Sequence, residues 1–407
     1  MDVKSRLLNY IAVNTVSDEA VAGEKIPSTE HQFELARMLE KELNELGLEK
    51  VIVDDHCYVY ALLPATKGME NKKAMGLIAH MDTAPAFSGE NIKPQIIENY
   101  DGKDVVLKGT GDILKVETFP HLASLKGRTL ITTDGTTLLA ADDKAGIAAI
   151  LTAVEEIINE GTPHGDIWIG FTPDEEVGAG ADMFNLDYFK ADFAYTIDGD
   201  YEGEVAYENF NASTANVKVN GVNVHPGSAK NIMKNAAAIA CEYQSLMPEY
   251  LTPEHTEGRE GFIMLSEISG DNAEANMSFI IRDHDAALFE EKANLMKKAA
   301  EYLNTKYGEG VVEIEIKESY RNMLEVIEKN EYVVELAREA IRSVGLDPIS
   351  TPVRGGTDGA RLSFMGLPCP NLGAGAYAFH GPFEHVTVEG MEQSVKIIKY
   401  MASNPVD

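Results

Sequence analysis

The chain has 407 residues, of which 44% are hydrophobic and 25% charged, a composition typical of a globular protein long enough for two domains. Its 66 aspartate and glutamate residues outnumber 35 lysine and arginine residues, which gives a net charge of −31. Such a charge repels nucleic acids and anionic membranes, so neither is an expected partner.

The cysteines and the hydropathy of the chain indicate a compartment. Cys57, Cys241 and Cys369 are far apart and form no C-x-x-C motif, which favours a reducing environment without disulfides. No uninterrupted apolar run approaches the roughly 18 residues that would suggest a membrane span. The first residues predict an amphipathic helix rather than a signal peptide. We therefore expect a cytoplasmic protein.

In chain order, helices are predicted within residues 1–48, and a further helix over residues 144–159. Continuous apolar runs, typical of strands buried on both faces, occur at residues 74–79, before the second of these regions, and at 166–172 and 193–197, after it. Residues 85–135 are rich in glycine, proline and charge and predict loops with small strands.

Side chains able to bind a metal come directly after each of the three buried strands. They are His80 and Asp82, then Asp174, Glu175 and Glu176, and finally Asp198. In open α/β sheets, ligands bind at the carboxyl ends of the strands. The sequence therefore predicts a polar site at one edge of a sheet.

The pattern changes at about residue 211. Strands and helices between residues 212 and 319 follow the order β-α-β-β-α-β, which is that of a ferredoxin-like domain. The α/β pattern then resumes with a helix over 330–344. We predict a first domain formed by residues 1–210 and 323–407, interrupted by an inserted domain over residues 211–322.

Asp142 and Asp143 stand directly before the helix predicted over residues 144–159. Paired acids at this position often cap backbone N–H groups and meet the positive end of the helix dipole. Together with the other acids and histidines, however, Asp142 is also a candidate carboxylate bridge between two divalent ions.

Two further assignments stay open on spacing alone. Three consecutive acids often form a solvated turn. In a metal site, Glu175 and Glu176 would divide metal binding and proton transfer between them in an order that spacing does not give. His380 and His385 are likewise both available as ligands.

Taken in order, these motifs resemble those of the M20 family of metallopeptidases, which are co-catalytic di-zinc exopeptidases. The similarity spans nearly the whole chain and is carried by His80-Met81-Asp82, residues 141–146 and 174–178, Asp198 and His380. It implies a zinc-exopeptidase-like α/β/α catalytic domain with an inserted ferredoxin-like (βαββαβ) lid domain.

The resemblance also implies two Zn²⁺ ions per chain. One zinc is expected to be held by His80, Asp142 and Asp198, and the other by Asp142, Glu176 and His380. His380 is preferred to His385 because the family ligand precedes a turn and an acidic residue.

The remaining roles follow from the same resemblance. Glu175 is expected to be the general base, Asp82 to orient His80, and the peptide bond after Asp142 to be cis. By the same resemblance, His225 is a candidate substrate-binding residue that reaches the developing oxyanion. Arg282 and Arg354 are candidates for binding the peptide carboxylate, because guanidinium matches carboxylate geometry, with ordinary salt bridges as the alternative.

Segments 208–212, 225–230, 281–283, 354–359 and 362–371 resemble those of the tripeptide aminopeptidases of this family. They imply hydrolysis of the N-terminal bond of tripeptides by metal-activated water with a glutamate base, in a monomer or homodimer. The alternatives are a related dipeptidase, carboxypeptidase or N-acyl-amino-acid deacylase, because all share one hydrolytic core. A non-catalytic metal-binding scaffold is a more remote alternative.

Overall fold

The computed structural model describes residues 1–407 and divides into two compact units. The first unit comprises Met1–Tyr207, Glu325–Thr351 and Thr357–Asp407. The second comprises Glu208–Leu324 and, from a separate part of the chain, Pro352–Gly356. The sequence pattern gave no indication that this last short segment belongs with the inserted region.

A seven-stranded sheet forms the centre of the first unit, in the order β1-β2-β8-β3-β9-β15-β10. Its strands are β1 (Glu49–Val53), β2 (Val59–Leu63), β3 (Met75–His80), β8 (Ile167–Thr172), β9 (Phe193–Gly199), β10 (Val205–Ala206) and β15 (Asn371–Gly373). β3 pairs in parallel with both β8 and β9. The carboxyl ends of these three neighbours therefore meet at one edge of the sheet.

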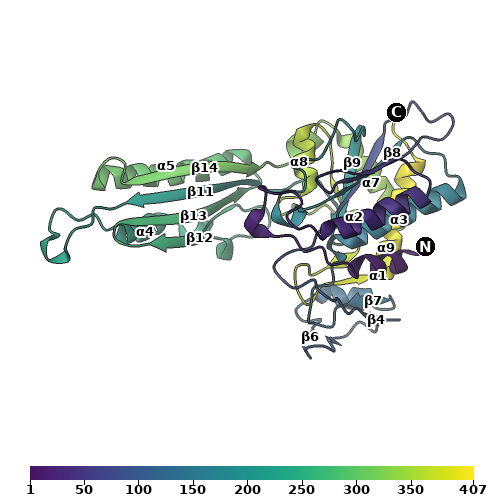
Figure 1. Ribbon diagram of the computed structural model, residues 1–407, viewed down its shortest axis with the longest axis horizontal. Coiled ribbons are helices and arrows are strands. Elements are labelled where there is room, and N and C mark those ends of the chain that lie inside the picture. Colours follow the sequence, from purple (N-terminus) through teal and green to yellow (C-terminus); the bar gives the residue numbers. More distant parts are fainter. The chain divides into compact units, whose positions relative to one another are not determined.

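Helices cover this sheet because its central strands are buried on both faces. α3 (Ala141–Glu160) packs on β3 and β9, and it contacts α1 (Val3–Ile11) and α9 (Val388–Ser403) (Figure 1). α2 (Gln32–Glu45) packs on β1 and β2, α7 (Glu331–Ser343) on α9, and α8 (Asp358–Met365) on β9. None of the helices is both long and apolar enough to cross a bilayer.

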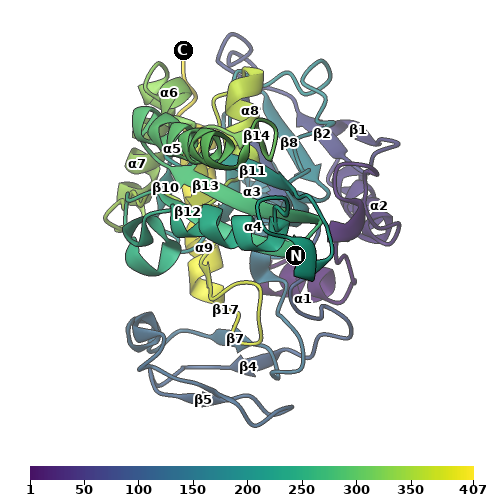
Figure 2. The same ribbon diagram turned by 90° about the vertical axis from the view of Figure 1, so that its left-hand side faces the viewer.

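The predicted mixed region of residues 85–135 forms small strands at the margin of the first unit. A four-stranded sheet has the order β16 (Ala376–Tyr377), β17 (His385–Thr387), β7 (Leu130–Thr132) and β4 (Gln95–Ile97), and β5 (Val105–Val106) pairs with β6 (Ile113–Leu114). Figure 2 shows β17, β7, β4 and β5 in succession. The connection between β16 and β17 contains His380.

The second unit is a four-stranded antiparallel sheet with helices, in the strand order β12-β13-β11-β14. Its elements are β11 (Asn211–Asn220), α4 (Ala236–Ser245), β12 (Phe262–Gly270), β13 (Glu274–Asp283), α5 (Ala286–Tyr307) and β14 (Val312–Tyr320) (Figure 1). Ala215, Val217 and Val219 alternate along β11 into a hydrophobic cluster shared with α4 and α5. This is the predicted ferredoxin-like order of elements.

Candidate metal centre

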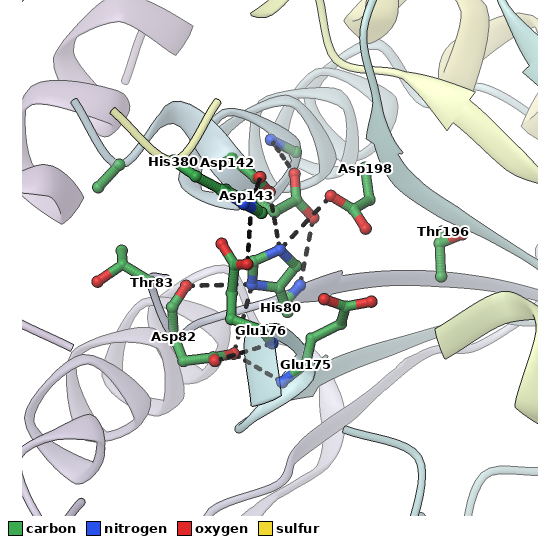
Figure 3. A network of polar contacts seen from close by, with 12 residues as sticks. His80, Asp82, Thr83, Asp142, Asp143, Glu175, Glu176, Thr196, Asp198 and His380 are labelled. Atoms are coloured by element: carbon green, nitrogen blue, oxygen red, sulfur yellow. Dashed lines mark hydrogen bonds and ion pairs between the residues drawn. The ribbon is translucent and has the colours of Figure 1, made fainter. Parts of the chain in front are cut away.

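Five segments of the first unit bring acids and histidines together at the carboxyl edge of the large sheet, and one of them is the connection between β16 and β17, which carries His380. β3 ends at His80, Glu175 and Glu176 follow β8 after a short turn, and Asp198 lies near the end of β9. α3 starts beside these strands and carries Asp142 in its first turn (Figure 3). Parallel pairing of β8, β3 and β9 is the reason that side chains so distant in sequence meet.

The carboxylate of Asp142 lies between two histidines. Its Oδ1 is 2.9 Å from Nε2 of His80, and its Oδ2 is 3.1 Å from Nε2 of His380. Each oxygen therefore faces a different imidazole (Figure 3). The peptide bond between Asp142 and Asp143 is cis, as the resemblance implied.

A second acid accompanies each imidazole. Nε2 of His80 is 3.4 Å from Oδ1 of Asp198, and Nε2 of His380 is 2.8 Å from Oε2 of Glu176. Ligands of a tetrahedral zinc ion, with bonds of 2.0–2.2 Å, lie about 3.3–3.6 Å apart. Only the 3.4 Å spacing falls in this range, and the other three are hydrogen-bond distances. It is therefore the donor types of these side chains, brought together in one cluster, that fit divalent metal ions.

Two sets of three residues have potential ligand atoms that all lie within 4.8 Å of one another, and we call them trios. One trio is His80, Asp142 and Glu176, and the other is His80, Glu175 and Asp198. Both trios combine imidazole with carboxylate, the mixture that zinc and similar ions bind. His80 belongs to both trios, which places it centrally in the cluster.

Burial and the repulsion between neighbouring carboxylates shift the pKa values of the acids in this cluster. Burial raises the pKa of Asp198 and of Glu176 to about 7 each, and the charge of Asp142 adds to both shifts. Burial would also raise the pKa of Asp142, but hydrogen bonds from His380 and His80 hold it below its usual value. Such an accumulation of buried carboxylates is stabilised by a bound cation.

The neighbouring carboxylates raise the pKa values of both histidines. Hydrogen bonds to Asp142 and then to Glu176 raise the pKa of His380 to about 11. Burial lowers the pKa of His80, but the neighbouring acids, first Asp198, raise it well above its usual value. Each imidazole is therefore held by carboxylates that would share a metal ion with it.

Asp82 contacts more than the histidine it was expected to orient. Nδ1 of His80 lies 3.1 Å from the backbone oxygen of Asp82 and 3.4 Å from its carboxylate. The same carboxylate accepts the backbone N–H groups of Glu175 at 2.9 Å and Glu176 at 3.1 Å. Asp82 thus connects the end of β3 with the turn after β8.

Glu175 and Glu176 point to different partners, which spacing alone could not show. Glu176 reaches His380, whereas the Glu175 carboxylate lies within 4.8 Å of ligand atoms of His80 and Asp198 (Figure 3). Burial, and then the charge of Asp198, raises the pKa of Glu175 well above its usual value. A carboxylate with a raised pKa is a stronger proton acceptor than an ordinary one.

His380, and not His385, lies beside Asp142. Nδ1 of His385 is 2.7 Å from the backbone oxygen of Phe383, and its Nε2 is 2.9 Å from Nε2 of His121. Both nitrogens of His385 therefore have partners away from the cluster.

The three expected substrate-binding residues all belong to the second unit. Exposed His225 accepts the N–H of Gly227 at the start of a short turn. The guanidinium of Arg282 donates to the backbone oxygens of Ser213 and Ile281 and lies over the Tyr320 ring.

Arg354 also has partners within the second unit. Its guanidinium donates to the backbone oxygens of Gly258 and Glu260 at 2.8 and 2.9 Å, and it lies over the Phe210 ring. Each arginine thus already has structural contacts, and only part of its donor capacity is available to a ligand.

Several supporting acids have no signal in the sequence beyond their proximity to the motifs. Asp143 accepts the N–H groups of His80 and Gly146, and Glu384 accepts N–H groups of the segment around Asp142. Asp174, a member of the acidic triplet, accepts from Ser28 and Gln32 instead of facing the cluster. Their partners are distant in sequence, so only the folded chain shows their contacts.

Comparison with known proteins gives the family of the chain. The model of "Peptidase family M20/M25/M40" matches residues 139–404. The chain is 53% identical over 400 residues to "Peptidase T" of Caldanaerobacter subterraneus subsp. tengcongensis, covering 97% of each chain.

Solved structures share the fold. Aminopeptidase PepT from Bacillus cereus matches with a TM-score of 0.77 at 24% identity, covering 98% of each chain. A dinuclear metal-binding peptidase of the M20 family from Bacillus subtilis matches with a TM-score of 0.66 at 14% identity, covering 99% of this chain and 98% of that one. The chain belongs to peptidase family M20/M25/M40.

Proposed function

We propose that the chain is a di-zinc aminopeptidase that removes the N-terminal residue of tripeptides. The observation that carries the metal chemistry is the position of Asp142, whose two oxygens face His80 and His380. The substrate class rests on the 53% identical relative called peptidase T.

In this proposal, one zinc is held by His80, Asp142 and Asp198, and the other by Asp142, Glu176 and His380. The imidazole and carboxylate donors, which lie next to one another in the folded chain, support this assignment. When bound, the ions lower the pKa of a water molecule and polarise the scissile carbonyl.

Glu175 is proposed as the general base. Its carboxylate takes a proton from the attacking water as the new C–O bond forms, and passes that proton to the amine nitrogen as the C–N bond breaks. Its raised pKa allows it to hold the proton between the two steps. Asp82 holds the backbone of Glu175 in place through a 2.9 Å hydrogen bond, and its contacts with His80 fix the imidazole tautomer.

Residues of the second unit are proposed to complete substrate binding. His225 would donate to the developing oxyanion, because an imidazole N–H directed there stabilises the negative charge. Arg282 and Arg354 would bind the peptide carboxylate through N–H groups not used by backbone oxygens, because guanidinium matches carboxylate geometry.

We also propose that the enzyme acts in the cytoplasm. Its three cysteines, Cys57, Cys241 and Cys369, are all free, as expected in a reducing compartment.

A panel of matched di-, tri- and tetrapeptides, free and N-acetylated, tests the proposal with zinc supplied. Release of N-terminal residues from free tripeptides is expected, because acetylation removes the α-amino group that an aminopeptidase recognises. Preference for dipeptides or acylated substrates would contradict the tripeptide assignment and favour a related dipeptidase or deacylase. The absence of hydrolysis in the whole panel would contradict the enzyme assignment.

A further inference from the structure

Glu384 is a buried acid whose contacts lie at the start of α3 and just before it. Glu384 is only 1% exposed. Oε2 accepts the backbone N–H groups of Leu139 at 2.7 Å and Ala140 at 3.1 Å, and Oε1 accepts that of Asp142 at 3.0 Å. One carboxylate thus binds three N–H groups within four residues.

This segment has no local acceptor for those groups. Ala140 stands at the N-cap of α3 in the left-handed conformation (φ 62°, ψ 28°), and it makes no side-chain capping bond. A left-handed alanine is strained and persists only where its surroundings enforce it. The Glu384 carboxylate supplies the missing acceptors at the N-terminal end of α3.

The loop that contains Glu384 also contains His380. Both residues lie in the connection between β16 and β17. The His380 side chain is 49% exposed, whereas Glu384 is buried. The contacts of Glu384 therefore hold this loop against the backbone of Asp142, independently of the side-chain contact between His380 and Asp142.

The far end of the loop is fixed separately. His385 and Val386 of β17 pair with β7, and Nε2 of His385 is 2.9 Å from Nε2 of His121. Between this fixed end and His380, Glu384 is the side chain that reaches the Asp142 segment. The Glu384 carboxylate thus links the loop that carries His380 to the backbone of Asp142, although these two proposed ligands are far apart in the sequence.

We propose that Glu384 is a positioning residue, which keeps the bridging carboxylate of Asp142 and the imidazole of His380 at the separation that the metal pair needs. This inference rests on the metal site proposed above. Glu384 acts through the backbone of Asp142 and does not touch the ions or the substrate.

The test compares E384Q and E384A with E389Q in the full chain. The matched control, Glu389, also accepts a backbone N–H, that of Thr129 at 2.8 Å, but it has no contact with the Asp142 segment. Zinc affinity is measured by chelator competition, kcat and KM with a free tripeptide, and folding by thermal melting. The absorption spectrum of the Co²⁺-loaded protein reports ligand geometry.

E384Q is expected to lose about 10- to 100-fold in zinc affinity, because its amide NH₂ faces a backbone N–H. We expect kcat to fall by a similar factor, KM to change less than threefold, and the Co²⁺ spectrum to change. E384A should lose more zinc affinity than E384Q. E389Q should match the wild type in zinc affinity, kcat, KM and Co²⁺ spectrum. If E384A does not fold, the nearly isosteric E384Q decides.

Wild-type zinc affinity, kcat and Co²⁺ spectrum in E384Q would overturn the inference, even if its melting temperature fell. D142N, measured in parallel, separates this failure from that of the metal site. If D142N loses zinc and E384Q does not, only the role of Glu384 is wrong. If D142N also binds zinc like the wild type, the proposed metal site itself is wrong.

Discussion

At the scale of single residues, neighbouring acids have different surroundings and therefore different chemistry. Asp174, Glu175 and Glu176 are consecutive, yet the first accepts hydrogen bonds from Ser28 and Gln32, and the third reaches His380. Glu175, the second residue of the three, has its carboxylate near His80 and Asp198. A local run of acids is thus divided into a structural group, a proposed base and a proposed ligand.

Replacing Glu175 with glutamine tests its role as the base. Glutamine keeps the shape of the side chain but cannot carry the proton, so kcat with a free tripeptide should fall by about 10²- to 10⁴-fold. Bound zinc should equal that of the wild type, because Glu175 is not a proposed ligand. E328Q, at an exposed position, is the control. A kcat within tenfold of the wild type would contradict the assignment.

The raised pKa of Glu204, which lies outside the metal cluster, predicts how the free energy of unfolding depends on pH. Burial, and then the charge of Asp200, raises its pKa from 4.5 to about 7 in the folded chain. Between these pH values the folded state keeps a proton that the unfolded state has released, so wild-type stability falls as pH rises. The contribution is fully present below pH 4.5 and lost above pH 7.

E204Q has no such titration. Its free energy of unfolding relative to the wild type should therefore rise by up to about 3 kcal/mol between pH 4.5 and pH 8. Urea denaturation at the two pH values measures this difference, with E301Q at an exposed position of α5 as the control. A relative stability of E204Q that stays constant with pH would show that Glu204 is not perturbed.

At the scale of elements, the site depends on how closely α3 approaches β9. A Cβ atom at Gly146 would overlap the backbone oxygen of Ile197. Ile197 precedes Asp198, so the absence of a side chain at Gly146 allows the first turn of α3 to lie beside this acid. Helix position and ligand position are therefore linked.

G146A should push α3 away from β9. We expect a loss of about 1–3 kcal/mol in the free energy of unfolding, from overpacking, together with weaker zinc binding as Asp142 moves from Asp198. Urea denaturation and chelator competition measure the two effects. G355A is the control, because a Cβ there would meet only Val353, at 3.9 Å. Wild-type stability and affinity in G146A would contradict this link.

The sequence predicted most elements that carry the site, because each has a local signal. The apolar runs before His80, Asp174 and Asp198 correspond to β3, β8 and β9, and the order β-α-β-β-α-β matches the second unit. The contacts of Glu384 and Asp143 were not predicted, since they join segments that only tertiary packing brings together. The helix α9 was not predicted, and Pro352–Gly356 gave no sign of its association with the second unit.

At the scale of the whole molecule, the proposed ligands and the base all lie in the first unit, although they span residues 80 to 380. The second unit has its own hydrophobic cluster and contains the proposed substrate-binding residues. Metal binding is therefore expected to be a property of the first unit.

The number of metal ions per chain tests the account most directly. After dialysis against zinc, elemental analysis should find two ions in the wild type, because Asp142 is proposed to bridge two sites. H380A should keep about one, since it removes a ligand from only one site, and D142N should fall below H380A. Two ions in H380A, or one ion in the wild type, would contradict a metal pair shared through Asp142.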